Sequence, residues 1–420
     1  MSELDKAAQS IGSLTVFRNI LSDETVSRFL RLLDAAQSGD AALFCSEYGS
    51  FFKSLSEQCE AIDFAAYLEN LIRFDDNAFS RAAACPDQTV AYNILRQAAV
   101  FDIDVIGRIA GMDSAALKSD DNWHGNDLLY LIKRLPDYSC ERVLFRQDAV
   151  SAVSELETFY REKGYGVFAQ YGAFRWQGSL AGVPHPDPVR LSSLKEYDYE
   201  RSQVAANTLD FLEGRGGGNL LLYGDRGTGK SSTIKALANE YRDRKLRIVE
   251  ISKEYIHDLP AVLERLRGVP MRFILFLDDL TFASDDAAFS ALKSVLEGGV
   301  IARPENCLVY ATSNRRHLIK ESFSERDSDD VHGGETMQEK LSLYDRFDRT
   351  VNFFAPDQAR YLAIVCAIAK ERGLQAKQAE LERGAVQWAI RTGGRSPRTA
   401  KQFVEWAMIQ IQKNEPILDE

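Results

Sequence analysis

The sequence predicts an α/β protein: a five-stranded parallel sheet with helices on both faces, a mainly helical N-terminal domain and a C-terminal helical lid. Three observations predict this class. Apolar residues recur three and four positions apart before residue 162, short apolar runs alternate with amphipathic segments after 219, and only helical patterns follow Pro356. We expect a helical domain over 1–162, a linker over 163–190, an α/β domain over 191–355 and a helical lid over 356–420.

The N-terminal block shows its clearest helical periodicity at 15–36 and 91–111. Each amphipathic stripe needs an apolar partner, so we expect a helical bundle there. Residues 163–190 are rich in Gly, aromatic residues and then Pro, which favours extended segments and a linker. The expected strands are 219–224, 246–251, 272–278, 307–312 and 350–354, and the expected lid helices are 357–372, 378–392 and 397–412.

Length and composition limit the class of protein further. The chain has 420 residues, 45% hydrophobic and 27% charged, which is the composition of a globular protein with more than one domain. No apolar run reaches the roughly 18 residues that span a bilayer, and the first residues lack a secretion signal. The six cysteines form no C-x-x-C pair, which argues against a zinc site and a disulfide framework. We expect a cytoplasmic protein with no membrane partner.

Charge is divided unevenly along the chain. Residues 1–190 carry 18 Lys and Arg against 27 Asp and Glu, whereas residues 191–420 carry 33 against 35. Neutralisation of phosphates supplies most of the non-specific affinity for nucleic acids. The acidic N-terminal half therefore disfavours a broad nucleic-acid-binding face, although a local basic patch stays open as an alternative.

The strongest motif is GDRGTGKS at 224–231, which fits G-x-x-x-x-G-K-[ST] at every fixed position. It follows a predicted strand and precedes a helical pattern, as a phosphate-binding loop does. Backbone amides at the start of that helix should surround a triphosphate. We expect Lys230 to neutralise the β- and γ-phosphates and the Ser231 hydroxyl to bind Mg²⁺. The expected nucleotide-binding residues of the loop are Gly224, Asp225, Arg226, Gly227, Thr228, Gly229, Lys230, Ser231 and Ser232.

Two consecutive acids, Asp278 and Asp279, end the predicted strand 272–278. We expect Asp278 to hold Mg²⁺ together with Ser231 and Asp279 to orient or deprotonate the attacking water. The alternative is that the acids cap the following helix, a common role of Asp.

Polar residues also follow the predicted strand 307–312. We expect Asn314 to lie near the γ-phosphate and its water, with Thr312 and Ser313 as competitors. The alternative is that Asn314 caps the helix that follows.

These strings resemble the AAA+ ATPase superfamily over about 191–412. GDRGTGKS resembles its Walker A box, FILFLDD its Walker B box, ATSN its sensor 1, EKLSLYDRF its box VII and RSPRTAKQF its sensor 2. More closely, YGDRGTGKSS, LKSVLEGG, ATSNRRHLI, QEKLSLYDRF and RSPRTAKQF resemble a bacterial family of predicted ATP-binding proteins, the domain of unknown function 815. The resemblance implies a magnesium-dependent hydrolase that converts ATP to ADP and phosphate to drive a conformational change. It names no client.

The resemblance also implies roles for two late arginines. Arg346 in LYDRF resembles the arginine finger that reaches a neighbouring subunit's nucleotide, and Arg398 in SPRTA resembles the lid arginine that contacts the γ-phosphate. Arg349 competes for the first role and Arg395 for the second, and a surface ion pair is the alternative for either. A finger implies a homo-oligomer, as a ring or a filament.

Upstream of the loop, residues 191–208 resemble the segment that encloses adenine in this superfamily. The resemblance places Tyr197 beside the base. The alternative is a packing tyrosine at a domain junction.

Departures from the superfamily pattern leave several functions open. Asp278-Asp279 stands where most members have Asp-Glu, which implies slow hydrolysis, and no glycine follows Tyr255-Ile256, where peptide-threading members have one. We expect an ATPase that remodels an unknown client. The alternatives are a slow nucleotide-gated switch whose N-terminal helices bind a protein partner, or a DNA-handling ATPase of the loader type.

Overall fold

A computed structural model describes residues 10–85, 90–119, 123, 127–141, 144–281, 287–297, 303–314, 345–413 and 415–417. The chain forms two compact units, Met1–Gln170 and Tyr171–Glu420. The division falls inside the segment that the sequence suggests as a linker. The finer expected division into four segments stays a prediction.

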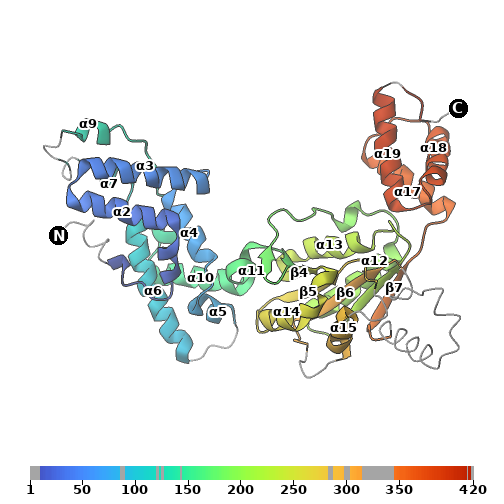
Figure 1. The fold of residues 1–420 in the computed structure, drawn as a ribbon, viewed down its shortest axis with the longest axis horizontal. Coiled ribbons are helices and arrows are strands. Elements are labelled where there is room, and N and C mark those ends of the chain that lie inside the picture. Colours follow the sequence, from blue (N-terminus) through green and yellow to red (C-terminus); the bar gives the residue numbers. More distant parts are fainter. Residues whose placement is uncertain are drawn as a thin grey trace. The chain divides into compact units, whose positions relative to one another are not determined.

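The N-terminal unit is helical, as expected (Figure 1). Asp or Asn side chains accept a hydrogen bond from the first turn of most of its helices, which satisfies an amide that the helix itself leaves unpaired. Asp23 caps α2, Asp63 caps α4 and Asp148 caps α10. The main helices are α2 (Glu24–Ser38), α3 (Ala41–Gln58), α4 (Phe64–Arg73), α5 (Ala78–Ala84), α6 (Val90–Ala110) and α10 (Ala149–Lys163), with shorter α7 (Ser114–Leu117), α9 (Leu129–Ile132) and α11 (Gly166–Gln170).

Aromatic rings fill the centre of this unit. Phe29 lies 4.3 Å from Phe64 and 5.1 Å from Phe51 between ring centroids, and all three are fully buried. The buried carboxylate of Asp102 on α6 accepts hydrogen bonds from the backbone amides of Thr15 and Phe17 at 2.9 Å. These contacts hold the N-terminal segment against the bundle.

The second unit contains a seven-stranded sheet in the order β2-β1-β4-β5-β6-β3-β7. All neighbouring strands are parallel except β1 and β2. The five strands that the sequence predicts are present, each within one residue of the expected bounds. They are β3 (Leu220–Gly224), β4 (Leu246–Ile251), β5 (Arg272–Leu277), β6 (Cys307–Ser313) and β7 (Arg349–Phe353).

The prediction of five strands was two short. Strands β1 (Ala173–Trp176) and β2 (Leu180–Gly182) come from the expected linker and extend the sheet beyond β4. Phe174 and Trp176 are buried while Arg175 between them is exposed, which is the period-two pattern of a strand. The pattern covers only four residues between glycine-rich turns. Such a short run is hard to tell from a loop, and pairing with β4 is what fixes it.

Both faces of the central strands are covered by helices. Residues of β3, β5 and β6 are buried on both sides, as in a parallel sheet between two helical layers. Figure 1 shows α13 above the strands and α14 and α15 below them. The helices are α12 (Asp198–Leu212), α13 (Lys230–Glu240), α14 (Leu259–Leu266) and α15 (Ala287–Glu297).

Three helices form the C-terminal lid at the predicted positions. They are α17 (Gln358–Glu371), α18 (Gln378–Arg391) and α19 (Pro397–Gln412). Ser396 and Thr399 form a capping box at the start of α19, and Pro397 occupies its first turn, where no intrahelical amide bond is lost. In the described ranges, none of the helices combines the length and apolar character that crossing a bilayer requires.

Candidate nucleotide-binding site

The phosphate-binding loop connects β3 to α13, and glycines make its shape possible. Gly227 and Gly229 have φ of +75° and +97°, values that residues with a Cβ atom rarely adopt. Gly224 also approaches the neighbouring strand closely, because a Cβ atom there would lie 2.1 Å from the carbonyl oxygen of Phe353. The loop therefore ends at the amino terminus of α13, which begins at Lys230.

Lys230 is buried, and the loop itself holds its ammonium group. Nζ donates hydrogen bonds to the carbonyl oxygens of Gly224 at 2.9 Å and Asp225 at 2.7 Å, and to Oδ1 of Asn314 at 3.1 Å. Burial lowers the pKa of Lys230, and the neighbouring carboxylates of Asp225, Asp279 and Asp278 act against that shift. The ammonium group of Lys230 is therefore held inside the phosphate-binding loop.

Ser231 and Asp278 meet directly. The Ser231 hydroxyl donates to Oδ1 of Asp278 at 2.6 Å, and the hydroxyl of Thr312 donates to the same oxygen at 2.6 Å. Strands β3, β6 and β5 are consecutive neighbours in the sheet, so their carboxyl ends meet at one edge. The two expected magnesium ligands thus lie side by side.

Asp279 and Asn314 also meet. The side-chain amide of Asn314 donates to Oδ1 of Asp279 at 2.5 Å, while its oxygen accepts from Lys230. Asp279 has φ of +51°, an uncommon backbone conformation for a non-glycine residue. Its own amide donates to the Thr312 hydroxyl at 2.8 Å. The acid that the sequence places beside the attacking water is therefore linked to the loop lysine through one asparagine.

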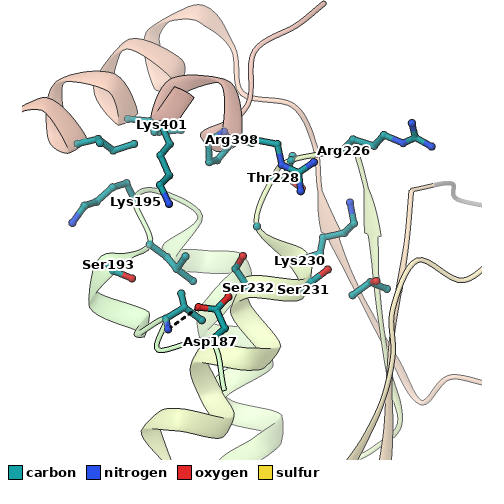
Figure 2. Close-up of a pocket in the computed structure, with 18 of the residues that line it drawn as sticks. Asp187, Ser193, Lys195, Arg226, Thr228, Lys230, Ser231, Ser232, Arg398 and Lys401 are labelled. Atoms are coloured by element: carbon teal, nitrogen blue, oxygen red, sulfur yellow. Dashed lines mark hydrogen bonds between the residues drawn. The ribbon is translucent and has the colours of Figure 1, made fainter. Parts of the chain in front are cut away.

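A cavity of about 930 Å³ brings these groups together (Figure 2). The loop from Arg226 to Ser232 forms one side, both acids with Thr312 and Asn314 form the floor, and the segment 187–195 and the lid form the remaining walls. Ile364 and Ile368 of α17 add apolar surface. The cavity has the size and mixed lining of a site for a compact polar ligand with an apolar part.

The lid presents positive charge to the loop. Figure 2 shows Arg398 and Lys401 extending from α19 into the cavity. The backbone amide of Arg398 donates to the Gly227 oxygen at 3.2 Å. A Cβ atom on Gly227 would lie 2.8 Å from Oγ of Ser396, so this glycine lets α19 approach the loop. Arg395, the competitor of Arg398, lines a separate small pocket on the lid.

The expectation that Tyr197 lies beside the base is not met. Tyr197 is 1% exposed and does not line the cavity. Its ring stacks on Phe353 at 5.6 Å, the Arg360 guanidinium lies 4.0 Å from the ring centroid, and its hydroxyl donates to the Phe354 oxygen at 2.6 Å. Burial raises its pKa to about 12. The tyrosine packs where the last strand leads to the lid, which is the alternative that the sequence left open.

Arg346 lies outside the cavity and forms an ion pair with Glu297 at the end of α15. Within one chain this is the surface ion pair that the sequence gave as its alternative, and a role between chains stays a prediction. Arg349, its competitor, begins β7. Most of the box VII string, residues 339–344, lies outside the described residues.

Sequence reasoning missed residues 187–190 of the cavity wall, whereas residues 191–195 belong to the segment that the resemblance expects to enclose adenine. Asp187, Val189 and Lys195 line the cavity, and Asn239 of α13 fixes the segment by donating to the oxygens of Asp187 and Val189, both at 2.8 Å. Lys195 pairs with Glu371 of α17 at 3.0 Å. Residues 187–190 carry no motif, and only the proline-rich stretch to which they belong could have drawn attention to them.

The side chains of Ser231 and Asp278 in the cavity are suited to bind a magnesium ion. A serine hydroxyl and a carboxylate are hard oxygen ligands, and Mg²⁺ in nucleotide sites takes one or two such protein ligands and completes its shell with phosphate oxygens and water. Among the described residues, no cluster of three or more His, Cys, Asp or Glu side chains could hold a metal by itself. The Ser231–Asp278 pair suits an ion that arrives with a nucleotide.

The strand order, the loop and the helical lid together define a P-loop protein of the AAA+ type. The family model described as "Protein of unknown function (DUF815)" matches residues 169–410. The match spans more than half of the chain, so the protein belongs to this family. That confirms the resemblance of the sequence strings.

Solved structures of AAA+ proteins share parts of the architecture at low identity. A single-residue variant of Thermotoga maritima RuvB is 18% identical, with a TM-score of 0.39, covering 55% of this chain and 68% of that one. Thermotoga maritima RuvB described as a Holliday junction branch migration motor is 17% identical, with a TM-score of 0.37 and the same coverage. The FIGL-1 AAA domain in complex with ADP is 17% identical, with a TM-score of 0.36, covering 55% and 76%. Such weak likenesses say nothing about what this chain binds. No curated protein matches the chain in sequence.

Proposed function

We propose that this protein is a magnesium-dependent ATPase that hydrolyses ATP to ADP and phosphate to drive a conformational change in itself and a client. The observation that carries the proposal is the meeting of Ser231 and Asp278 at 2.6 Å on the floor of a cavity that Lys230 also lines. A cation and a pair of hard oxygen ligands at the start of a helix are what a magnesium triphosphate requires.

In this proposal the loop binds the triphosphate and Lys230 exchanges its carbonyl partners for phosphate oxygens. Ser231 and Asp278 hold Mg²⁺, which when bound neutralises charge on the β- and γ-phosphates. Arg398 contacts the γ-phosphate from the lid. Its guanidinium is a permanently charged fork suited to phosphate oxygens.

Asp279 and Asn314 act on the water. Asn314 contacts both Lys230 and Asp279, so a γ-phosphate that draws the lysine away also frees the asparagine to turn toward it. Asp279 then orients or deprotonates the water. Its side chain is one carbon shorter than that of the more common glutamate, and we expect slow turnover for that reason.

Arg346 completes the site of a neighbouring subunit. It does not line its own cavity, which suits a residue that acts between chains. A homo-oligomer, as a ring or a filament, follows from this role, and cytoplasmic location remains our expectation.

The second candidate is a nucleotide-gated binding switch. It is favoured by apolar side chains exposed on one helix of the N-terminal unit: Val90, Ile94 and Phe101 of α6 are 81%, 64% and 49% exposed. They offer a protein partner an apolar contact surface. A peptide-threading role is disfavoured because Ile256, at the expected position of the threading loop, is fully buried. The acidic N-terminal half disfavours DNA handling.

The ATPase rate as a function of protein concentration, with and without cell extract, tests the proposal. Rising specific activity supports assembly, and stimulation by extract supports a client. Slow turnover that extract does not change supports the switch. If calorimetry detects no binding of magnesium ATP to the pure protein, both candidates fail.

A further inference from the structure

We infer that Thr312 is a positioning residue that fixes both acids of the site through a single hydroxyl group. The inference rests on the proposed binding of magnesium ATP. From the sequence alone, Thr312 is only an alternative to Asn314 as the residue near the γ-phosphate. Its contacts point to a different role, between the two acids.

Thr312 lies at the carboxyl end of β6, next to the end of β5. The two strands pair in parallel, with Leu277 opposite Ala311. The residues that follow this pair are Asp278 and Thr312, which therefore lie side by side. Thr312 is 2% exposed. Its backbone oxygen also accepts from the amide of Leu280 at 2.7 Å. The threonine is therefore held rigidly by the sheet on one side and by the segment after β5 on the other.

The hydroxyl of Thr312 makes one bond to each acid. It donates to Oδ1 of Asp278 at 2.6 Å and accepts from the backbone amide of Asp279 at 2.8 Å. A hydroxyl has one proton to donate and two lone pairs. Since the proton is committed to Asp278, Thr312 cannot donate it to a phosphate without releasing that acid.

The bond to Asp278 sets the orientation of the carboxylate. Its Oδ1 accepts from both Ser231 and Thr312, while Oδ2 has no hydrogen-bond partner within the described ranges. Two donors on one oxygen prevent the carboxylate from rotating. Outer partners of this kind fix a ligand in the orientation that the metal needs, and losing one costs about 10–100-fold in metal affinity.

The bond to Asp279 supports an unfavourable backbone. At φ of +51° Asp279 adopts a left-handed backbone conformation that is unfavourable for a non-glycine residue and persists only where its surroundings hold it. The Thr312 hydroxyl satisfies the amide of this residue, and Asn314 holds its side chain. Removing the hydroxyl leaves the amide without this partner and loosens the acid beside the expected water.

The test compares Thr312→Val, which keeps the shape and loses the hydroxyl, with Thr312→Ser, which keeps the hydroxyl. The matched control is Thr208→Val. Thr208 is also fully buried, and its hydroxyl bonds to the Val204 oxygen at 2.8 Å and to the hydroxyl of Tyr310 at 2.9 Å, on α12 and outside the cavity. Binding of a non-hydrolysable fluorescent ATP analogue is measured as Mg²⁺ is titrated, and again in EDTA.

Mg²⁺ should increase the affinity for the ATP analogue, and we expect Thr312→Val to raise the Mg²⁺ concentration that gives half of this increase by about 10–100-fold. The affinity for the analogue in EDTA should be unchanged. Thr312→Ser and Thr208→Val should keep the Mg²⁺ dependence of the parent. Parental Mg²⁺ dependence in a folded Thr312→Val protein, judged by its melting curve, overturns the inference. If that variant does not fold, Thr312→Ala replaces it and is judged by the same outcomes. If the parent itself shows no tightening by Mg²⁺, the proposed function fails, whatever Thr312 does.

Discussion

The hydroxyl of Ser231 donates a 2.6 Å hydrogen bond to Oδ1 of Asp278, although 47 positions separate the two residues in the chain. Ser231 is the second residue of α13, the helix after β3, and Asp278 follows β5. Strand β6 lies between those two strands and contributes Thr312 and Asn314 to the same place. The residues of the proposed site therefore meet at the carboxyl ends of β3, β5 and β6. Because each residue has its own contacts, we expect a different result from each substitution.

Lys230→Ala should weaken ATP binding by about 30-fold or more. Removing one partner of a desolvated charge pair costs about 2–5 kcal/mol, and each 1.4 kcal/mol is a factor of ten. Isothermal titration calorimetry with magnesium ATP measures the change. Lys235→Ala is the control, because Lys235 lies on the same helix, packs over the Phe276 ring and does not line the cavity. Equal affinity of the two variants would contradict the role of Lys230.

Asp279→Asn and Asp278→Asn should separate catalysis from metal binding. The first should keep magnesium ATP affinity and lower the hydrolysis rate by about 100-fold or more, the usual contribution of a general base. The second should lose the dependence of binding on Mg²⁺. Phosphate release and nucleotide binding are measured on both proteins. An Asp279→Asn protein that hydrolyses ATP at the parental rate would show that another group activates the water.

Arg398→Ala should weaken ATP binding by about tenfold or more, because hydrogen bonds to charged groups are worth about 1.5–3 kcal/mol. The structure separates this arginine from its competitor, since Arg398 lines the nucleotide cavity and Arg395 lines another pocket. Arg395→Ala should therefore bind ATP as the parent does. The same calorimetric titration compares the two proteins, and a larger loss for Arg395→Ala would reverse the assignment.

Arg346→Ala should lower hydrolysis by about 1,000-fold, the lower limit for an arginine finger supplied by a partner, without weakening ATP binding. The effect should appear only at concentrations where subunits assemble. Mixing Arg346→Ala with Lys230→Ala should recover activity, because one chain then supplies the nucleotide site and the other the finger. Arg349→Ala is the matched comparison. Failure of every mixture to recover activity, with assembly intact, would show that Arg346 acts within its own chain.

ATP binding should take up protons at alkaline pH. Burial holds the pKa of Lys230 below its ordinary 10.5 in the free protein, and phosphate favours the charged form, so the affinity falls as pH rises through the lowered pKa. The free energy of unfolding of the protein without nucleotide changes with pH in the opposite direction. Between the lowered pKa of Lys230 and its ordinary value, the unfolded chain binds more protons than the folded chain, so the stability of the fold increases as pH rises.

Calorimetry in buffers with different ionisation enthalpies measures the proton uptake directly. The Lys401→Gln protein tests which side chain takes up the proton, because Lys401 also lines the cavity. Uptake should persist in that protein if Lys230 is the titrating group. Uptake that disappears with Lys401 would assign the titration to the lid.

Much of the site could be predicted because its parts are local. The loop 224–231 needs glycines at fixed positions for its own backbone, and the apolar run before Asp278 marks a strand end whatever surrounds it. The fold class and the lid helices follow from periodicity in the same way. Their signals lie within a few residues of each other along the chain.

Other features depend on which segments pair. The short run 173–176 becomes a strand only because β4 offers it an edge, and Tyr197 packs on Phe353 because β7 ends beside α12. The wall formed by 187–195 likewise depends on Asn239, about fifty positions away. No local pattern encodes these contacts.

The amino-acid sequence alone determined the class of fold, the phosphate loop and the identity of its two acids, because backbone conformation and hydrophobic period are properties of neighbouring residues. The tertiary structure decided which side chains meet at the loop: Thr312 between the acids, Arg398 rather than Arg395 in the cavity, and Tyr197 in the core. The physical reason is that strand order and helix packing, which depend on burial across the whole unit, bring distant residues within hydrogen-bonding distance.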